Sequence, residues 1–284
     1  MDRCWAVGGV FRGFEGFRGF RGFEGFRGFR EFGGVVVWIV VIWAVVRVGS
    51  FIVGRDTFSG THSKTEKYMM IIAHPDDESM FFGPFLSCAA RRKSGVVVVV
   101  LTDGAGGGDR ATRQKEMEKL CRDEGIELFS LGERDGYLKT TQELIDQLIV
   151  IFKLTQSGKV VTFDKKGVSR HTDHTECFYI AKTLATQLKQ PTFLALQTFS
   201  LFGKYFAYFP PLSQALCPGQ ARHCTRGSYA PLTIKNTLKD SLSCRKRMLY
   251  HKSQLLWFRY CYILLSTYMD VNVLEEVRSD VWSD

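Results

Sequence analysis

The sequence lacks several patterns that identify common binding sites. None of its eight cysteines forms a C-x-x-C pair, which argues against a thiolate zinc site. The glycine-rich stretch 104–108 has no third glycine at the G-x-G-x-x-G spacing, and no Gly-Lys-Ser/Thr follows it. Neither a dinucleotide fingerprint nor a P-loop is therefore expected. The longest uncharged apolar run, residues 33–46, is shorter than the ~20 residues of a typical membrane span.

The bulk composition is that of a globular protein with one sizeable domain. The chain has 284 residues, of which 45% are hydrophobic and 24% are charged. A net charge of +9 favours anionic partners, which include nucleic acid, acidic lipid and phosphate-bearing substrates. Several cysteines lie in apolar stretches, and we interpret them as reduced residues of a domain that faces the cytosol. A Cys217–Cys224 disulfide in an oxidising compartment is the alternative.

Residues 1–32 form a low-complexity tract in which Phe-Arg-Gly and Phe-Glu-Gly units repeat. Glycine at every third position disfavours a helix, and the alternating charges disfavour a buried core. We predict a disordered extension. An RG-like nucleic-acid tail is the alternative, but glutamates interrupt the positive run, and no nucleic-acid partner is expected.

Residues 33–53 are predicted to be a single transmembrane anchor, followed by a linker at 54–66. The segment reaches membrane-spanning length only if Arg47 is included near one end. A buried strand or a core helix is the alternative. Arginines upstream of the segment would place the N-terminus in the cytosol, whereas the cysteines favour a cytosolic domain on its other side. The residues alone leave the orientation open.

Residues 67–284 are predicted to form an α/β domain with a Rossmann-like, three-layer, mainly parallel sheet. Apolar, β-branched runs alternate with helical patterns, which is typical of parallel sheets. The expected strands are 68–73, 95–101, 126–131, 160–163 and 192–199, and the expected helices are 78–93, 110–124, 141–155 and 175–188. In such sheets ligands bind beyond the carboxyl ends of the strands.

The strongest chemical signal is the sequence Ala73-His-Pro-Asp-Asp-Glu78, directly after the first strand. Imidazole and carboxylate are suitable ligands for zinc. Of the adjacent acids Asp76 and Asp77, one can bind a metal while the other takes a proton. The alternative is a helix N-terminus that the acids stabilise, which does not account for His74.

A second histidine-rich signal follows the strand that ends at Phe163. His171 and His174 are three residues apart, so one helical turn would place both on one face. The pair is expected to face the first cluster across the sheet edge. A purely structural histidine is the alternative.

A third signal is the glycine loop 104–108 after the second strand, which we interpret as a flexible loop giving close backbone approach to a ligand. Arg113, one turn into the next helix, is within reach of a hydroxyl or phosphate of that ligand. The alternative is that Arg113 lies on a solvated helix face.

With these residues in view, the sequence resembles the LmbE-like (PIG-L) superfamily of zinc-dependent N-acetylglucosamine deacetylases, over residues 67–276. Within it, the eukaryotic branch that acts on N-acetylglucosaminylphosphatidylinositol is most similar. The A-H-P-D-D-E motif matches in full, and Arg113-x-x-Glu116 resembles the family's R-x-x-E-L. The other matching segments are 162–164, 167–174, 204–205, 251–254, 257–259, 268–269 and Asn272. Two departures are Arg170, where the family has glycine, and Asp173, where it has asparagine.

The resemblance implies a role for each matching residue. It implies that His74, Asp77 and His174 bind Zn²⁺ or another divalent metal. It further implies that Asp76 is the general base and that His171 stabilises the oxyanion. Arg113 would hold the sugar.

The resemblance also implies a substrate and a place in the cell. The expected reaction releases acetate from the glycolipid N-acetylglucosaminylphosphatidylinositol, an early step of GPI-anchor synthesis. The expected location is the endoplasmic reticulum membrane, with the catalytic domain in the cytosol. Two alternatives are an amidase for a soluble N-acetylglucosaminyl substrate and a membrane-tethered interaction protein whose site has decayed.

Overall fold

A computed structural model describes residues 66–206 and 231–279. The predicted repeat tract 1–32, the membrane anchor 33–53 and nearly all of the linker 54–66 lie outside these residues. Within the two described ranges, the helices are all too short or too polar to cross a membrane.

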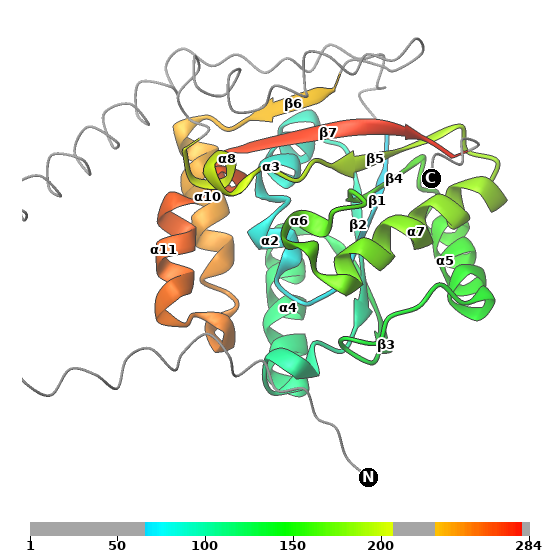
Figure 1. Cartoon of the computed structure of the whole chain (residues 1–284), viewed down its shortest axis with the longest axis horizontal. Coiled ribbons are helices and arrows are strands. Elements are labelled where there is room, and N and C mark those ends of the chain that lie inside the picture. Colours follow the sequence, from blue (N-terminus) through cyan, green and yellow to red (C-terminus); the bar gives the residue numbers. More distant parts are fainter. Residues whose placement is uncertain (1–65, 207–230, 280–284) are drawn as a thin grey trace, which may run out of the picture. The chain divides into compact units, whose positions relative to one another are not determined.

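The core is a seven-stranded sheet in the order β3-β2-β1-β4-β5-β7-β6 (Figure 1). The first five strands pair in parallel, while β7 runs antiparallel to both of its neighbours. The strands are β1 (Tyr68–Ile72), β2 (Val96–Thr102), β3 (Glu127–Glu133), β4 (Lys159–Phe163), β5 (Thr192–Leu196), β6 (Leu232–Lys235) and β7 (Val271–Arg278). The predicted Rossmann-like, mainly parallel sheet is confirmed, and β6 and β7 are additions that the sequence pattern did not predict.

Helices cover both faces of the sheet and complete three layers (Figure 1). One face carries α5 (Gln142–Leu154) and α7 (Thr172–Gln187), and α7 packs on β4 and β5. The other face carries α3 (Gly83–Arg92) and α4 (Arg110–Glu124), with α10 (Leu238–Met248) packed on α3. Beyond α10 lies α11 (Trp257–Leu265). The central strands β1 and β2 are almost completely buried, which explains their continuous apolar sequence.

Two predicted helices and one predicted strand differ most from the structure in their bounds. The expected helix 78–93 is two helices, α2 (Asp77–Met80) and α3, because the chain breaks before Gly83-Pro84 and proline occupies the start of α3. The helix expected at 175–188 begins earlier, at Thr172. The strand expected at 192–199 ends at Leu196, where the chain turns toward α8 (Leu201–Phe206).

The order of the strands determines where ligands can bind. β1 lies between β2 and β4. The strands β2 and β3 extend the sheet on one side of β1, and β4 and β5 extend it on the other side. A crevice forms at such a switch point, beyond the carboxyl ends of the strands. The loop after β1 carries residues 73–78, and the loop after β4 leads to residues 167–174. Both histidine motifs therefore meet at one edge of the sheet.

Candidate active site

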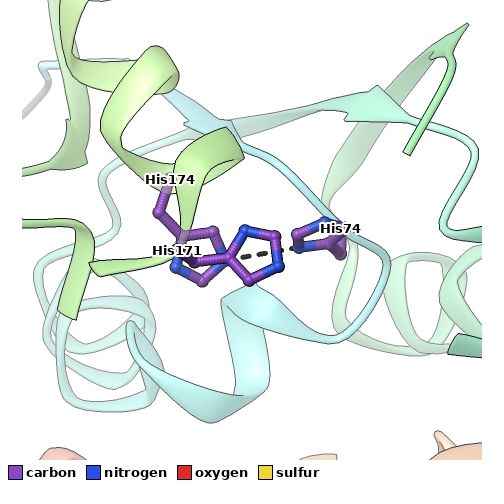
Figure 2. Close-up of side chains that lie close together, drawn as sticks. All are labelled: His74, His171 and His174. Carbon is purple, nitrogen blue, oxygen red and sulfur yellow. Dashed lines mark hydrogen bonds between the residues drawn. The ribbon is translucent and has the colours of Figure 1, made fainter. Parts of the chain in front are cut away.

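His74, Asp77 and His174 meet at the switch point. Figure 2 shows the two histidines side by side, although a hundred residues separate them in sequence. His74 Nδ1 lies 3.3 Å from His174 Nε2. Asp77 offers Oδ2 at 3.5 Å from His74 Nδ1 and Oδ1 at 3.3 Å from His174 Nε2. Ligands of a tetrahedral zinc ion with bonds of ~2.0–2.1 Å are about 3.3 Å apart, so the triangle has the size of such a site.

In each of the two imidazole rings, the nitrogen that points away from Asp77 makes a hydrogen bond, and this bond determines whether the other nitrogen has a lone pair that faces Asp77. His74 Nε2 lies 3.2 Å from Asp135 Oδ1, and the pKa of Asp135 is lowered, chiefly by this hydrogen bond. The carboxylate can only accept, so Nε2 donates and the Nδ1 lone pair faces Asp77. In the same way His174 Nδ1 donates to the carbonyl of Gly167 at 3.2 Å, which leaves the Nε2 lone pair facing inward.

This arrangement fits a divalent cation. Two imidazole lone pairs and a carboxylate converge on one point, and they repel one another unless a positive charge lies between them. Burial alone lowers the pKa of His74, but hydrogen bonds that its ring donates to the carboxylates of Asp135, Asp173 and Asp77 outweigh burial and raise the pKa to about 12. The surrounding carboxylates thus attract positive charge, which a metal ion bound at Nδ1 would supply in place of a proton.

The ring of His174 is held by packing as well as by its hydrogen bond. It stacks on Phe163, the last residue of β4, with ring centroids 4.1 Å apart and planes 2° from parallel. The edge of the Phe81 ring covers it from another side. The strand and the loop therefore hold this nitrogen in position before any ligand binds.

His171 lies beside the triangle, in a different position from the one predicted. The sequence suggested that His171 and His174 share a helical face, but His171 is the extended N-cap of α7 and is exposed. The backbone N–H of Asp173 donates to His171 Nδ1 at 3.3 Å. Its ring centroid is 4.7 Å from that of His74 and 4.8 Å from that of His174 (Figure 2). A nitrogen of each of the three rings lies within 4.8 Å of the others, so His171 borders the cation position.

Asp173 contacts His74 and leaves the His171 ring largely unaffected. Its Oδ2 lies 3.4 Å from His74 Nε2 and accepts a 2.7 Å hydrogen bond from the N–H of Gly136. The pKa of His171 is lowered by burial and by the charges of His174 and His74, which outweigh Asp173. With asparagine in its place, His74 would lose one carboxylate partner.

Asp76 is buried next to the triangle in an uncommon backbone conformation. Its φ of 148° is rare for a residue with a side chain, and such strain is concentrated at functional sites. Oδ1 lies 3.3 Å from the Arg113 guanidinium and Oδ2 lies 3.5 Å from that of Arg259. Burial, reinforced by the charge of Asp77, raises the pKa of Asp76, whereas the imidazoles around Asp77 overcome its burial and hold its pKa well below the usual value. The pKa values of the two neighbouring acids are thus shifted in opposite directions, which suits the two acids to different roles.

Arg113 is buried, so the interpretation as a solvated helix face is wrong. Its guanidinium donates to the carbonyl of Gly104 at 2.6 Å and to that of Pro75 at 3.0 Å, in addition to its ion pair with Asp76. A Cβ at Gly107 would lie 2.6 Å from Arg113 Nη1, which explains the glycines of this loop. The backbone of these glycines therefore lies close against the Arg113 side chain. Gly107 also lines the cavity.

These groups open into a cavity of about 530 Å³ within the described part of the chain. All six residues predicted for the site line it: His74, Asp76, Asp77, Arg113, His171 and His174. Residues that the sequence reasoning did not place there are Asp135, Lys204, Tyr205, Gln254, Phe258, Arg259 and Tyr262. Asp135 follows β3 at its carboxyl end, so the rule applied to β1 and β4 would have found it. The others come from segments whose fold the sequence pattern did not predict.

Arg170 lies at the edge of this site. Its φ of 59° is left-handed, a conformation that glycine adopts without strain, which suits the glycine that the family resemblance implies at this position. The side chain is exposed, while its neighbours Ser169 and His171 line the cavity.

Known proteins that resemble the chain share its fold and most of its length. Residues 69–185 match the family model described as PIG-L: GlcNAc-PI de-N-acetylase. The chain is 29% identical over 249 residues to N-acetylglucosaminyl-phosphatidylinositol de-N-acetylase of Bos taurus, an alignment that covers 83% of the chain and 94% of that protein. It is 26% identical over 251 residues to the probable enzyme of that name in Schizosaccharomyces pombe, covering 82% and 97%.

A solved structure has the same fold at low sequence identity. The N,N'-diacetylchitobiose deacetylase of Pyrococcus horikoshii superimposes with a TM-score of 0.52 at 19% identity, covering 75% of this chain and 84% of that one. Together with the matched motifs, these findings identify residues 69–185 as a PIG-L domain, in a chain that is similar to de-N-acetylases over most of its length.

Proposed function

We propose that the protein hydrolyses the N-acetyl group of N-acetylglucosaminylphosphatidylinositol and releases acetate and glucosaminylphosphatidylinositol, an early step of GPI-anchor synthesis. One observation carries the proposal. The triangle of His74, Asp77 and His174 has the size of a zinc site and lies beside the buried Asp76, at the end of an open cavity. The names of the relatives supply the substrate.

We propose that His74, Asp77 and His174 hold a divalent cation, with zinc as the expected metal. When bound, such an ion polarises the acetamide carbonyl and makes a water molecule more acidic. Asp135 and the Gly167 carbonyl orient the two imidazoles from behind, as outer partners of metal ligands do.

Asp76 takes the proton of the attacking water in this scheme. Asp76 lines the cavity, and its buried Oδ2 receives no hydrogen bond from the described residues, so this acceptor is left for a ligand or a water molecule that enters the site. Arg113 and Arg259 favour its ionised form and oppose the effect of burial. The protonated acid then returns the proton to the departing amine, which completes the general acid–base cycle.

His171 stabilises the negative charge that develops on the acetamide oxygen. Because its Nδ1 accepts the N–H of Asp173, the proton of the neutral ring lies on Nε2. The ring is exposed at the cavity, and Nε2–H is thus free to donate to the oxygen.

Localisation is a separate proposal. The apolar segment 33–53 would anchor the chain in the endoplasmic reticulum membrane with the catalytic domain in the cytosol, where a lipid substrate is within reach. Its support is the sequence of that segment and the identity of the proposed substrate.

Acetate release by the purified full-length chain tests the proposal. We expect turnover of N-acetylglucosaminylphosphatidylinositol that a chelator abolishes and added zinc restores. Asp76→Ala should lose turnover and keep the metal, whereas His174→Ala should lose both. Turnover of a soluble N-acetylglucosaminyl substrate at an equal or higher kcat/KM would favour the soluble amidase, and a metal-free, inactive protein would favour the decayed site.

A further inference from the structure

Exposed apolar side chains gather on two short helices at one side of the molecule. On α11 the residues that point inward are Arg259, Tyr262 and Ile263, whereas the opposite face is apolar and exposed. We define the apolar rim as Leu201 and Phe202 of α8 together with Leu256, Trp257, Tyr260, Leu264 and Leu265 at α11. Trp257 is 79% exposed and Leu201 is 76% exposed. Such exposure is not expected for large apolar side chains of a helix that packs in a protein core.

The apolar rim borders the mouth of the cavity. The same two helices supply part of its lining: Lys204 and Tyr205 come from α8, and Phe258, Arg259 and Tyr262 come from α11. The helices are tied together, because Thr267 just after α11 donates a 2.8 Å hydrogen bond to the carbonyl of Gly203. Figure 1 places α8 and α11 next to each other at the edge of the fold.

The cavity combines three kinds of surface. His74 and Asp77 belong to the cation site, Lys204 and Arg259 line the same cavity from α8 and α11, and the rim residues lie on the exposed faces of those two helices. Arg259 Nε is buried and has no hydrogen-bond partner among the described residues, so one donor of this cation is free. A glycolipid carries three matching kinds of group: an acetamide, a phosphate and acyl chains.

The charge around the rim also selects among partners. Helix α11 contains no acidic residue. Tryptophan and tyrosine beside leucine are typical of helices that lie in the interface of a bilayer, where aromatic rings reach the headgroup level. A protein partner would not account for the continuity between this surface and a cavity with a free cationic donor.

We propose that the apolar rim docks on the surface of a phospholipid bilayer, so that a glycolipid enters the cavity headgroup first while its acyl chains stay in the membrane. The inference rests on the proposed function. It assigns a second membrane contact, distinct from the segment 33–53, that positions the cavity mouth at the lipid surface.

Kinetics with two forms of one substrate test the proposal. The full-length protein is given long-chain N-acetylglucosaminylphosphatidylinositol in phosphatidylcholine vesicles, or a short-chain analogue dissolved as monomers. We compare wild type with the double variant Trp257→Ser, Leu264→Ser. The matched control is Val150→Ser, Leu154→Ser on α5, whose side chains are 63% and 71% exposed away from the rim.

The rim variant should lose about tenfold in kcat/KM on the vesicle substrate, since it removes apolar surface that would be buried in lipid. It should stay within about twofold of wild type on the monomeric analogue. The control should match wild type on both. Equal losses on the two substrates, or no loss on vesicles, would overturn the docking surface. If wild type hydrolyses neither substrate, the proposed function itself fails.

A binding measurement that needs no turnover separates the two proposals. Vesicles with brominated phosphatidylcholine quench tryptophans that enter the bilayer. The fluorescence difference between wild type and Trp257→Phe isolates Trp257 from the chain's other tryptophans. We expect this difference to be quenched in brominated vesicles, and unquenched emission would place Trp257 in water and contradict the docking.

Discussion

The two walls of the cavity come from different parts of the chain and are built in different ways. The inner wall, within residues 66–206, consists of loops and helix starts that follow parallel strands and carries His74, Asp76 and His174. The outer wall, within residues 231–279, consists of η2 (Lys252–Gln254) and α11 and carries Gln254, Arg259 and Tyr262. The inner wall carries the groups that we propose for chemistry, whereas the outer wall carries polar, cationic and aromatic side chains.

The outer wall is held in place by polar contacts across long sequence separations. Ser253 donates from its N–H and its hydroxyl to Glu116, at 2.9 and 2.7 Å. Asn272 bridges β7 to the start of α3, since its amide donates to the Phe81 carbonyl at 2.7 Å and accepts from the Phe85 N–H at 3.0 Å. Ser253 and Asn272 belong to the matched family segments but lie outside the cation site, and both connect distant parts of the chain. Some positions of the family pattern therefore hold the fold together, while others line the site.

The largest expected effect comes from the inner wall. Asp76→Asn should lower kcat by about 10²–10⁴, because it removes the general base and keeps the shape. Metal content, measured by atomic absorption, should stay unchanged. The control is Asp146→Asn on the exposed face of α5, which should leave kcat as it is. If Asp76→Asn turns over substrate at the wild-type rate, the chemical role that we propose for the inner wall is wrong.

The pair of His251 and Glu78 tests how the walls depend on each other. His251 Nε2 lies 2.7 Å from Glu78 Oε1, and both side chains are fully buried. His251→Gln should lower the free energy of unfolding by about 3–5 kcal/mol, since it leaves a buried charge without its partner. The exposed neighbour change Lys252→Gln should cost little, and urea denaturation measures both.

The same pair predicts a pH dependence. Burial lowers the pKa of His251, but the charge and hydrogen bond of Glu78 outweigh it, so the folded-state pKa is raised above the ordinary histidine value of 6.5. Its contribution to stability is therefore complete below the unfolded pKa and is lost as pH rises through the folded pKa. His251→Gln should flatten this decline, and an unchanged pH profile would contradict the assignment.

A smaller effect is expected behind the metal ligands. Asp135→Asn should weaken metal affinity by about 10- to 100-fold, because the amide holds His74 less firmly than a carboxylate does. Competition with a metal-sensitive dye measures the affinity. Unchanged affinity in this variant would mean that His74 is oriented by Asp173 alone.

The smallest expected effect concerns backbone strain at Arg170, which lies at the edge of the inner wall. Arg170→Gly should raise the free energy of unfolding by about 0.5–1 kcal/mol, since glycine adopts a left-handed conformation without strain. Lys93, with a φ of 58° at the end of α3, is the matched case away from the cavity, and Lys93→Gly should gain a similar amount. A loss of stability in Arg170→Gly alone would show that the arginine side chain makes a favourable contact.

The inner wall was largely predictable from the chain itself. A strand followed by His-Pro-Asp-Asp, and a second strand followed by His-x-x-His, are local patterns whose meeting follows from parallel topology. Hydrophobic periodicity predicted β1 to β5 and the helices between them, with differences at the ends. Asp135 obeys the same strand-end rule.

The remaining features depended on tertiary structure. The antiparallel strands β6 and β7, the pairing of His251 with Glu78 and the entry of Arg259 into the cavity join residues that are far apart in sequence, and no local period encodes which of them meet. The inward direction of the lone pairs of His74 and His174 was also decided in space, because it depends on hydrogen bonds to Asp135 and Gly167. The sequence alone determined the candidate catalytic side chains and the sheet that brings them together. Long-range packing decided how they are oriented and what lies across the cavity from them, since only a folded chain brings distant hydrogen-bonding groups into contact.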